Sequence, residues 1–101
     1  MEKKTIEPQL FPLGAVVMTA NFSSRLGDLG EDVGTLAGVA LRKHQSGDWG
    51  ELAPSDARQN DEAVKSGERI HSVYRTRSGE KYWVITEWDR SVTTLLLPSD
   101  Y

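Results

Sequence analysis

The last third of the sequence restricts the fold most, because its side chains alternate there between two faces, as they do along β-strands. Residues 69–76 (RIHSVYRT) and 82–88 (YWVITEW) both alternate, and the turn between them at 77–80 contains a glycine. Two such segments joined by a short turn are typical of a β-hairpin. A second turn at 89–91 leads into VTTLLL at 92–97. The sequence therefore predicts a three-stranded antiparallel meander that ends at Pro98.

The first two thirds predict one further strand and two or three helices. A β-branched run at 15–19 favours a strand, whereas the three glycines within 21–34 favour one helical turn followed by a loop. Residues 35–45 and 55–66 have helical spacing and suitable ends. We predict an α+β fold, in which the meander and the N-terminal strand form a small antiparallel sheet with the helices on one face.

Composition limits the organisation of the chain more than its function. A chain of 101 residues predicts one domain, here 11–101 behind a flexible segment at 1–10. The chain has no long apolar run, no secretory signal and no cysteine, so a cytoplasmic location is the default expectation. A net charge of −3 argues against a strong phosphate-binding surface and against an acidic mimic of DNA.

The most distinctive motif is the loop at residues 44–52 (HQSGDWGEL). It places an imidazole, a carboxylate and an indole in a segment too rich in glycine to continue a helix. Gly47 and Gly50 allow a positive φ on either side of Asp48 and Trp49. The sequence leaves two interpretations open: a binding site, or a well-made turn.

His44 is the candidate for catalysis. A neutral imidazole oriented by Asp48 or Asp56 would be a general base that activates water or the Ser46 hydroxyl, as in a small hydrolase or transferase. In the structural alternative, which we favour, His44 packs on the core and bonds to Asp48 or a loop carbonyl. The catalytic hypothesis requires a partly accessible His44 near a carboxylate. A buried His44 with both ring nitrogens partnered would exclude it.

The aromatic side chains also have two interpretations. Trp49 can stack on a ligand or fold back over the core, and its glycine-flanked position favours the second. Along 82–88, Tyr82 and Trp88 lie on one strand face and Trp83 lies on the other. Since one face of such a sheet meets water, we expect Tyr82 and Trp88 to be surface aromatics available to a partner.

The turn at 89–91 contains the remaining candidate for binding. Arg90 there can bind a carboxylate or phosphate of a ligand. The structural alternative is an Asx-turn from Asp89 to Ser91, with Arg90 paired locally to Glu87 or Asp56. The predicted binding residues are Asp48, Trp49, Tyr82, Trp88 and Arg90.

Other chemistries are not expected. The chain has two histidines and no spaced pair of ligands for a metal, so we predict no metal and no cofactor. The segment GDLGEDVG at 27–34 lacks a following GK and carries three acids, which argues against phosphate binding. A nucleic-acid surface would need five cations on one face: Arg69, Arg75, Arg77, Lys81 and Arg90. We expect alternation to place Arg69 and Arg75 on opposite faces, so direct nucleic-acid binding is not predicted.

Three segments resemble a family of small, largely uncharacterised bacterial proteins found on plasmids and integrative elements. They are FPLGAVVMTA, HQSGDWGEL with Asp56 and Asn60 following, and GERIHSVYRTRSGEKYWVITEWDRSVTTLLLPSDY. The resemblance covers roughly residues 11–101. It rests on the motifs HxSGDWG and ITExDRSxTTxLLPxxY, and it is weakest in the glycine-rich region 27–38. It implies a fold and a mobile-element context, but no activity.

Together these observations predict a non-catalytic protein-binding module of a mobile genetic element. From the mobile-element context we expect the partner to be a host defence complex, inhibited in an anti-CRISPR or anti-restriction manner. The hydrolase or transferase built on His44, Asp48 and Asp56 is the alternative. A homodimer formed by sheet extension or by face packing also stays open.

Overall fold

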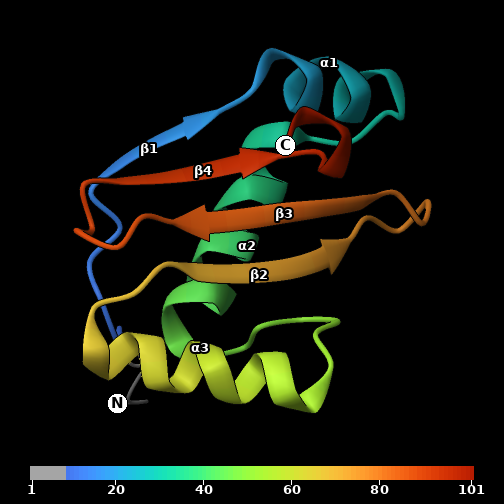
Figure 1. Ribbon diagram of the computed structural model, residues 1–101. Helices are drawn as coiled ribbons and strands as arrows, with labels where there is room; N and C mark the ends of the chain where they lie inside the picture. Colours follow the sequence, from blue (N-terminus) through green and yellow to red (C-terminus); the bar gives the residue numbers. More distant parts are fainter. Residues whose placement is uncertain (1–8) are drawn as a thin grey trace, which may run out of the picture.

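The computed structural model describes residues 9–101, which form a four-stranded sheet and three α-helices (Figure 1). The strands are β1 (Ala15–Met18), β2 (Ile70–Arg75), β3 (Lys81–Thr86) and β4 (Val92–Leu96). The helices are α1 (Ala20–Asp28), α2 (Val33–Ser46) and α3 (Pro54–Ser66), and a 3-10 turn η1 (Pro98–Asp100) follows β4. The predicted α+β class is confirmed.

The sheet has the order β1-β4-β3-β2 and is mixed. The predicted meander is confirmed, since β2 pairs antiparallel with β3 and β3 pairs antiparallel with β4. The prediction of an entirely antiparallel sheet is wrong at β1, which runs parallel to β4 with Ala15 opposite Val92. A close backbone contact accompanies this pairing: Gly14, at a φ of 66°, lies against the carbonyls of Arg90 and Ser91 where a Cβ would overlap them. This contact places the start of β1 beside the start of β4.

Helix α1 is longer than the single turn that the glycines predicted. The Thr19 hydroxyl caps it by accepting from the Phe22 N–H at 3.1 Å. Phe22 and Leu26, one turn apart, are both fully buried. Gly27 faces open space, so it lowers helix propensity without disturbing the packing. Burial of two large side chains outweighs the glycine cost of about 1 kcal/mol.

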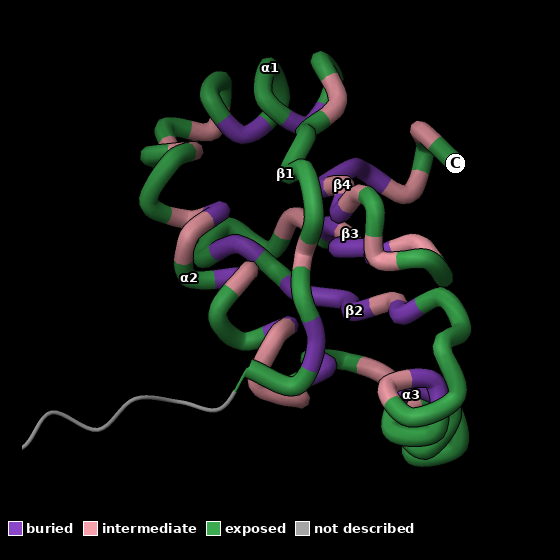
Figure 2. Tube along the Cα trace, turned by 90° about the vertical axis from the view of Figure 1, so that its left-hand side faces the viewer, coloured by how far each residue is buried: buried purple, intermediate pink, exposed green. Residues whose placement is uncertain are grey.

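Helices α1 and α2 cover one face of the sheet, and α3 lies beyond the β2 edge, toward the opposite side (Figures 1 and 2). The prediction that the helices pack on one face therefore holds for two of them. A main cluster forms between that face and the two helices, and its buried members are Phe22, Leu26, Ala37, Ala40, Tyr74, Tyr82, Val84, Leu95 and Leu97. A smaller cluster beside α3 contains Phe11, Trp49, Ala63 and Ile70.

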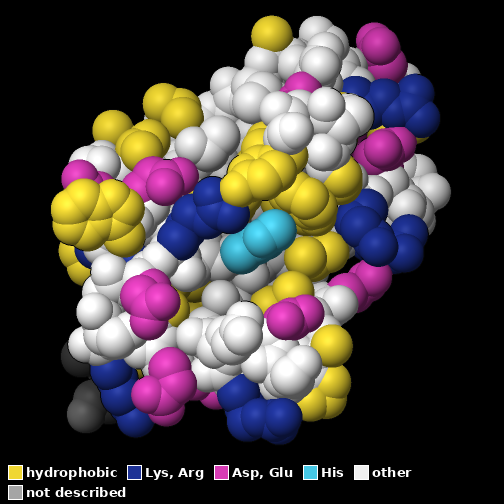
Figure 3. All heavy atoms as spheres, viewed as in Figure 1, with side chains coloured by type: hydrophobic (Ala, Val, Ile, Leu, Met, Phe, Trp, Pro, Cys, Tyr) yellow, Lys and Arg dark blue, Asp and Glu magenta, His cyan; other side chains and the backbone are white. Residues whose placement is uncertain are grey.

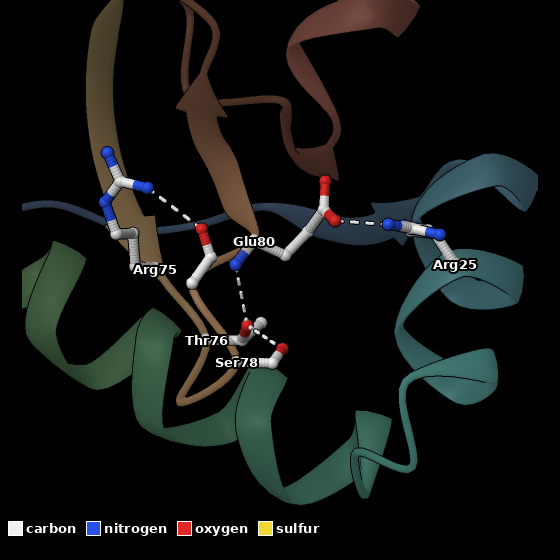
Figure 4. A network of polar contacts seen from close by, with 6 residues as sticks. Arg25, Arg75, Thr76, Ser78 and Glu80 are labelled. Carbon is white, nitrogen blue, oxygen red and sulfur yellow. Dashed lines mark hydrogen bonds and ion pairs between the residues drawn. The ribbon is translucent and has the colours of Figure 1, made fainter.

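The β2–β3 hairpin is joined to α1 by a polar network (Figure 4). Arg25 of α1 pairs with Glu80 at 2.9 Å, and the Glu80 N–H donates to the Thr76 hydroxyl at 3.0 Å. Arg75 donates to the Gly79 carbonyl at 2.9 Å. These bonds stabilise the turn between β2 and β3 and hold the start of β3 against α1.

The predicted flexible segment 1–10 lies mostly outside the described residues. Leu10, which is described, donates its N–H to the Gln45 carbonyl at 2.8 Å. Phe11 is buried against Trp49. None of the helices in residues 9–101 combines the length and the apolar character needed to cross a bilayer.

Candidate functional site

The HQSGDWGEL loop is built into the edge of the sheet. Gly47 ends α2 in the left-handed conformation at a φ of 91°, and Gly50 has a φ of 76°. The Val73 N–H donates to the Trp49 carbonyl at 3.1 Å, and the Glu51 N–H donates back to the Val73 carbonyl at 2.7 Å. A Cβ on Gly50 would overlap that same carbonyl. The glycines thus let the loop backbone pair with β2, which supports the structural interpretation of this motif.

His44 is completely buried on the inner face of the sheet. Its Nδ1 lies 2.6 Å from the Ser72 hydroxyl, and its Nε2 lies 2.9 Å from the Thr86 hydroxyl. Burial, more than the nearby charges of His71 and Arg90, lowers the pKa of His44 to about 3. The imidazole is therefore neutral at physiological pH.

A directed chain of hydrogen bonds fixes the tautomer of His44. The Thr93 hydroxyl donates to the Leu13 carbonyl at 2.8 Å, and a carbonyl can only accept. Thr93 must then accept from Thr86, which lies 2.7 Å away, and Thr86 must accept from His44 Nε2–H. The remaining nitrogen, Nδ1, accepts from Ser72. The network joins α2, three strands and the segment before β1.

The hydrolase or transferase hypothesis lacks the geometry that it required. It required an accessible His44 beside a carboxylate, but both ring nitrogens are bonded to hydroxyls in the core. Asp48 and Asp56 are exposed, and neither bonds to the ring. The Ser46 hydroxyl donates to the Lys43 carbonyl at 2.9 Å, within its own helix.

Two of the five predicted binding residues are in the core. Trp49 is 5% exposed, and its indole N–H donates to Asp61 at 2.9 Å. The lid interpretation of Trp49 is therefore confirmed. The prediction of an exposed Tyr82 is wrong: its side chain lies on the inner face beneath α1, edge-on to Phe22. The alternation correctly separated the two faces of β3, but α1 and α2 cover the face that we expected to meet water.

Arg90 connects the turn before β4 to α3. Its guanidinium donates to the carbonyls of Glu68, Ala63 and Glu87 at 2.6, 2.8 and 3.2 Å. Asp89 accepts from the Ser91 N–H at 3.0 Å, as the Asx-turn alternative predicted. Arg90 is thus held by backbone carbonyls rather than by the predicted carboxylates. Its donors are committed to the fold, which argues against ligand binding.

Asp48 and Trp88 are the predicted binding residues that stay exposed. The Asp48 carboxylate accepts from the Gly50 N–H at 3.2 Å, which is a turn contact. Trp88 is 67% exposed on the turn after β3. Asp48 lies in the loop beside β2, whereas Trp88 lies in the turn between β3 and β4. The two side chains do not form one site.

The other face of the sheet gathers residues that the sequence did not single out. We define the open face as the side chains directed away from α1 and α2: Ala15, Val17, His71, Val73, Arg75, Lys81, Trp83, Ile85, Val92, Thr94 and Leu96. Figure 3 shows apolar side chains, a histidine and Lys or Arg side chains together over the middle strands. The open face is thus mixed, and three of its apolar members, Val73, Ile85 and Leu96, are buried.

A row of four side chains crosses the open face. The His71 and Trp83 rings meet edge to face at 4.5 Å between centroids, and Trp83 meets Tyr101 at 5.6 Å. The Arg69 guanidinium lies over the Tyr101 ring at 5.1 Å. We call these four residues the aromatic row. Tyr101 is 68% exposed, so the row is accessible at this end.

His71 is anchored by its backbone and free at its ring. The Asn60 amide donates to the His71 carbonyl at 2.8 Å and accepts from its N–H at 3.2 Å. The ring atom Nε2 is shielded from solvent and has no hydrogen-bond partner within residues 9–101. Burial, followed by the charge of Arg69, lowers the pKa of His71. His71 therefore offers a neutral ring with an unsatisfied polar atom.

A hollow lies beside this histidine, between α3 and the start of β2. Its volume is about 810 Å³, and its lining includes Asp56, Asn60, Glu68, Arg69 and His71. Three acids (Asp56, Glu62 and Glu68) and two arginines (Arg58 and Arg69) line it, so it has no single sign of charge. In the described residues no group of three potential metal ligands comes together.

The expectation that Arg69 and Arg75 lie on opposite faces is wrong. They are six residues apart, an even spacing, and both lie on the Trp83 side. Arg75 is nevertheless paired with Glu51 at 3.0 Å, and Arg90 is bonded to carbonyls. The cations of the proposed nucleic-acid surface are therefore not jointly available. Correct parity counting from Arg69 to Arg75 would have placed both arginines on one face.

Comparisons with family models, with curated proteins and with solved structures found no match to this chain.

Proposed function

We propose that this chain is a non-catalytic protein-binding module whose contact surface is the open face of the sheet. The aromatic row carries this proposal. Aromatic and arginine side chains are enriched at the energetic centres of protein interfaces, where their large surfaces are desolvated together. The side chain that catalysis would have used, His44, is instead neutral and enclosed in the core.

The chemistry of the face defines the partner. Lys81 is exposed at one end of the face, and Arg69 stands at the other over Tyr101. Between them lie Trp83 and His71, with an unsatisfied nitrogen on the imidazole. A complementary protein segment presents apolar side chains flanked by carboxylates.

The narrower part of the proposal concerns the biological setting. The sequence resemblance to plasmid and integrative-element proteins supports a module of a mobile genetic element. A protein of that setting that binds without catalysis fits an inhibitor of a host defence complex, in an anti-CRISPR or anti-restriction role. The geometry supports binding, and the resemblance alone supports the setting.

Affinity capture from a lysate of the host bacterium tests the proposal. Tagged wild-type protein is compared with Tyr101→Ala plus Arg69→Glu, which removes one end of the aromatic row and reverses its charge. Val39→Ser is the matched control, because Val39 is 39% exposed on α2, away from the open face. We expect a partner that is retained by the control and lost, by at least about tenfold, with the double variant.

The captured protein is then purified and mixed with this chain at known concentrations. A direct complex that depends on the aromatic row supports the binding function, and a defence component as the partner supports the setting. A complex indifferent to both variants, or no complex with any captured protein, would overturn the proposal. Circular dichroism melts confirm that both variants keep the fold.

A further inference from the structure

Strand β1 is an edge with unusual exposure. All four of its residues are exposed, including Val16, Val17 and Met18 at 44%, 46% and 39% (Figure 2). The strand contains no charged residue and no proline. Charges and prolines are the common devices that stop an edge strand from pairing with another chain. Within residues 9–101, β1 has β4 on one side and no strand on the other.

The backbone groups that β1 leaves free follow from its pairing with β4. Ala15 N–H donates to the Ser91 carbonyl and Thr19 N–H donates to the Leu95 carbonyl, each at 3.0 Å. Backbone groups alternate in direction along a strand, so those of Val17 also face β4. The N–H and C=O of Val16 and Met18 therefore point away from the sheet.

The opposite edge of the sheet is closed. Along β2, the Asn60 side chain bonds to both backbone groups of His71. The Trp49 carbonyl and the Glu51 N–H do the same for Val73. The chain thus provides partners for one edge and leaves the other ready to pair.

We propose that β1 pairs antiparallel with β1 of a second copy, about a twofold axis at Val17. Val16 lies opposite Met18 of the second copy, and each exchanges both backbone hydrogen bonds with the other. The symmetry repeats this pair, so four hydrogen bonds form and the two sheets become one of eight strands. The two Val17 side chains meet at the axis in a pair without direct hydrogen bonds.

Two features favour a second copy over a different chain. The free groups of Val16 and Met18 are related by the twofold axis, so the edge is complementary to itself. The strand is uncharged, so the two paired strands bring no like charges together. Four residues on each side form a small interface, in the class below about 1,200 Å² that is typical of reversible association. The dimer is therefore dependent on concentration.

Sedimentation over a concentration series measures the association directly. We expect the wild-type protein to change from monomer to dimer as its concentration rises. Val16→Pro removes one outward N–H but no bond to β4, so it should weaken the dimer at least about tenfold and leave the monomer folded. An unchanged dimer in this variant would overturn the β1 geometry.

A cysteine at the axis provides a second test, since the chain has no cysteine of its own. Paired residues without direct hydrogen bonds have Cα atoms about 4.5 Å apart, within disulfide range. Val17→Cys should therefore form a disulfide dimer on mild oxidation, whereas the exposed control Val39→Cys should not. This test decides the matter if Val16→Pro fails to fold.

Two further outcomes would overturn the proposal. One is a wild-type protein that stays monomeric up to millimolar concentration. The other is a Val17→Cys variant that cross-links no faster than Val39→Cys. If the β1 variants instead lose a captured foreign protein while the free chain is monomeric, the edge binds that protein and not a second copy.

Discussion

The two histidines of this chain lie on opposite faces of the same sheet and have opposite surroundings. Both have a lowered pKa, and burial is the first cause for each. His44 has a hydroxyl on each ring nitrogen, whereas His71 Nε2 has no partner in the described chain. A buried polar group with its bonds completed belongs to the fold. His71 Nε2, on the face turned away from α1 and α2, is shielded and lacks such a bond.

The same contrast extends to the side chains around them. On the inner face, Thr86 and Thr93 are fully buried and continue the His44 network. On the open face, Trp83 and Tyr101 contact each other and leave ring surface exposed. Polar residues thus specify the arrangement of the core, and aromatic residues provide the proposed contact surface. The predictions below test this division.

The largest expected effect is the loss of His44. His44→Ala leaves a cavity and removes partners from two buried hydroxyls, so we expect it to lower the free energy of unfolding by about 3–5 kcal/mol. His71→Ala, on the open face, should cost about 1 kcal/mol or less. Urea denaturation followed by tryptophan fluorescence measures both. Similar losses in the two variants would contradict the contrast between the faces.

Acid should destabilise the fold through the histidines. His44 has a pKa near 6.5 when unfolded and about 3 when folded, so below pH 6.5 the unfolded state binds a proton that the folded state does not. Stability is therefore complete above pH 6.5 and falls as the pH is lowered toward 3. His71, whose pKa is also lowered, contributes in the same direction. The slope from His44 should reach about 1.4 kcal/mol per pH unit.

Urea melts between pH 7 and about pH 4.5 measure this slope. The window ends above the range where Asp89 and Asp100, whose pKa values are lowered by hydrogen bonds, begin to take up protons. His44→Gln cannot titrate and is the matched variant. A wild-type slope equal to that of His44→Gln would show that His44 does not produce the acid sensitivity.

A smaller effect separates two adjacent threonines of β4. Thr93 bonds to Thr86 and to the Leu13 carbonyl, whereas Thr94 lies on the open face. Thr93→Val should lower the free energy of unfolding by about 1–2 kcal/mol, because it leaves buried groups without partners. Thr94→Val should change it by less than about 0.5 kcal/mol. Thermal denaturation of both variants gives the comparison, and equal shifts would refute it.

The smallest stability effect is expected in the aromatic row. Tyr101 is 68% exposed, so Tyr101→Ala should cost less than about 1 kcal/mol. Its loss should nevertheless raise the solvent exposure of Trp83, which is seen as a red shift in fluorescence. Trp88→Ala, a variant of the exposed tryptophan on the turn, is the control for the fluorescence assignment. A large loss of stability in Tyr101→Ala would make the row structural.

Local pattern predicted most of the strands and helices. The meander, the helices α2 and α3 and the glycine loop all follow from spacing and turn chemistry within about a dozen residues. The same reasoning failed for α1, where the glycines suggested a loop. The burial of Phe22 and Leu26 against the sheet, which a local pattern does not contain, decided for the helix.

The candidate site was less predictable. Alternation sorted the residues of β3 into two sets, but it did not tell which set the helices cover. As a result, Tyr82 was predicted to be exposed, and Trp83 was not predicted as a binding residue. His71 and Tyr101 were also not predicted as binding residues, because they are brought to Trp83 from 12 residues before it and 18 residues after it in the sequence.

The sequence alone determined the class of fold, the order of its elements and the need for an irregular backbone around Asp48 and Trp49, because these depend on side-chain periodicity and on glycine. Tertiary structure alone decided that His44 is enclosed, that β1 runs parallel to β4, and that one face and one edge of the sheet are left open. These depend on which distant surfaces meet. Burial and hydrogen-bond completion are set by the whole assembly of elements and not by any one of them.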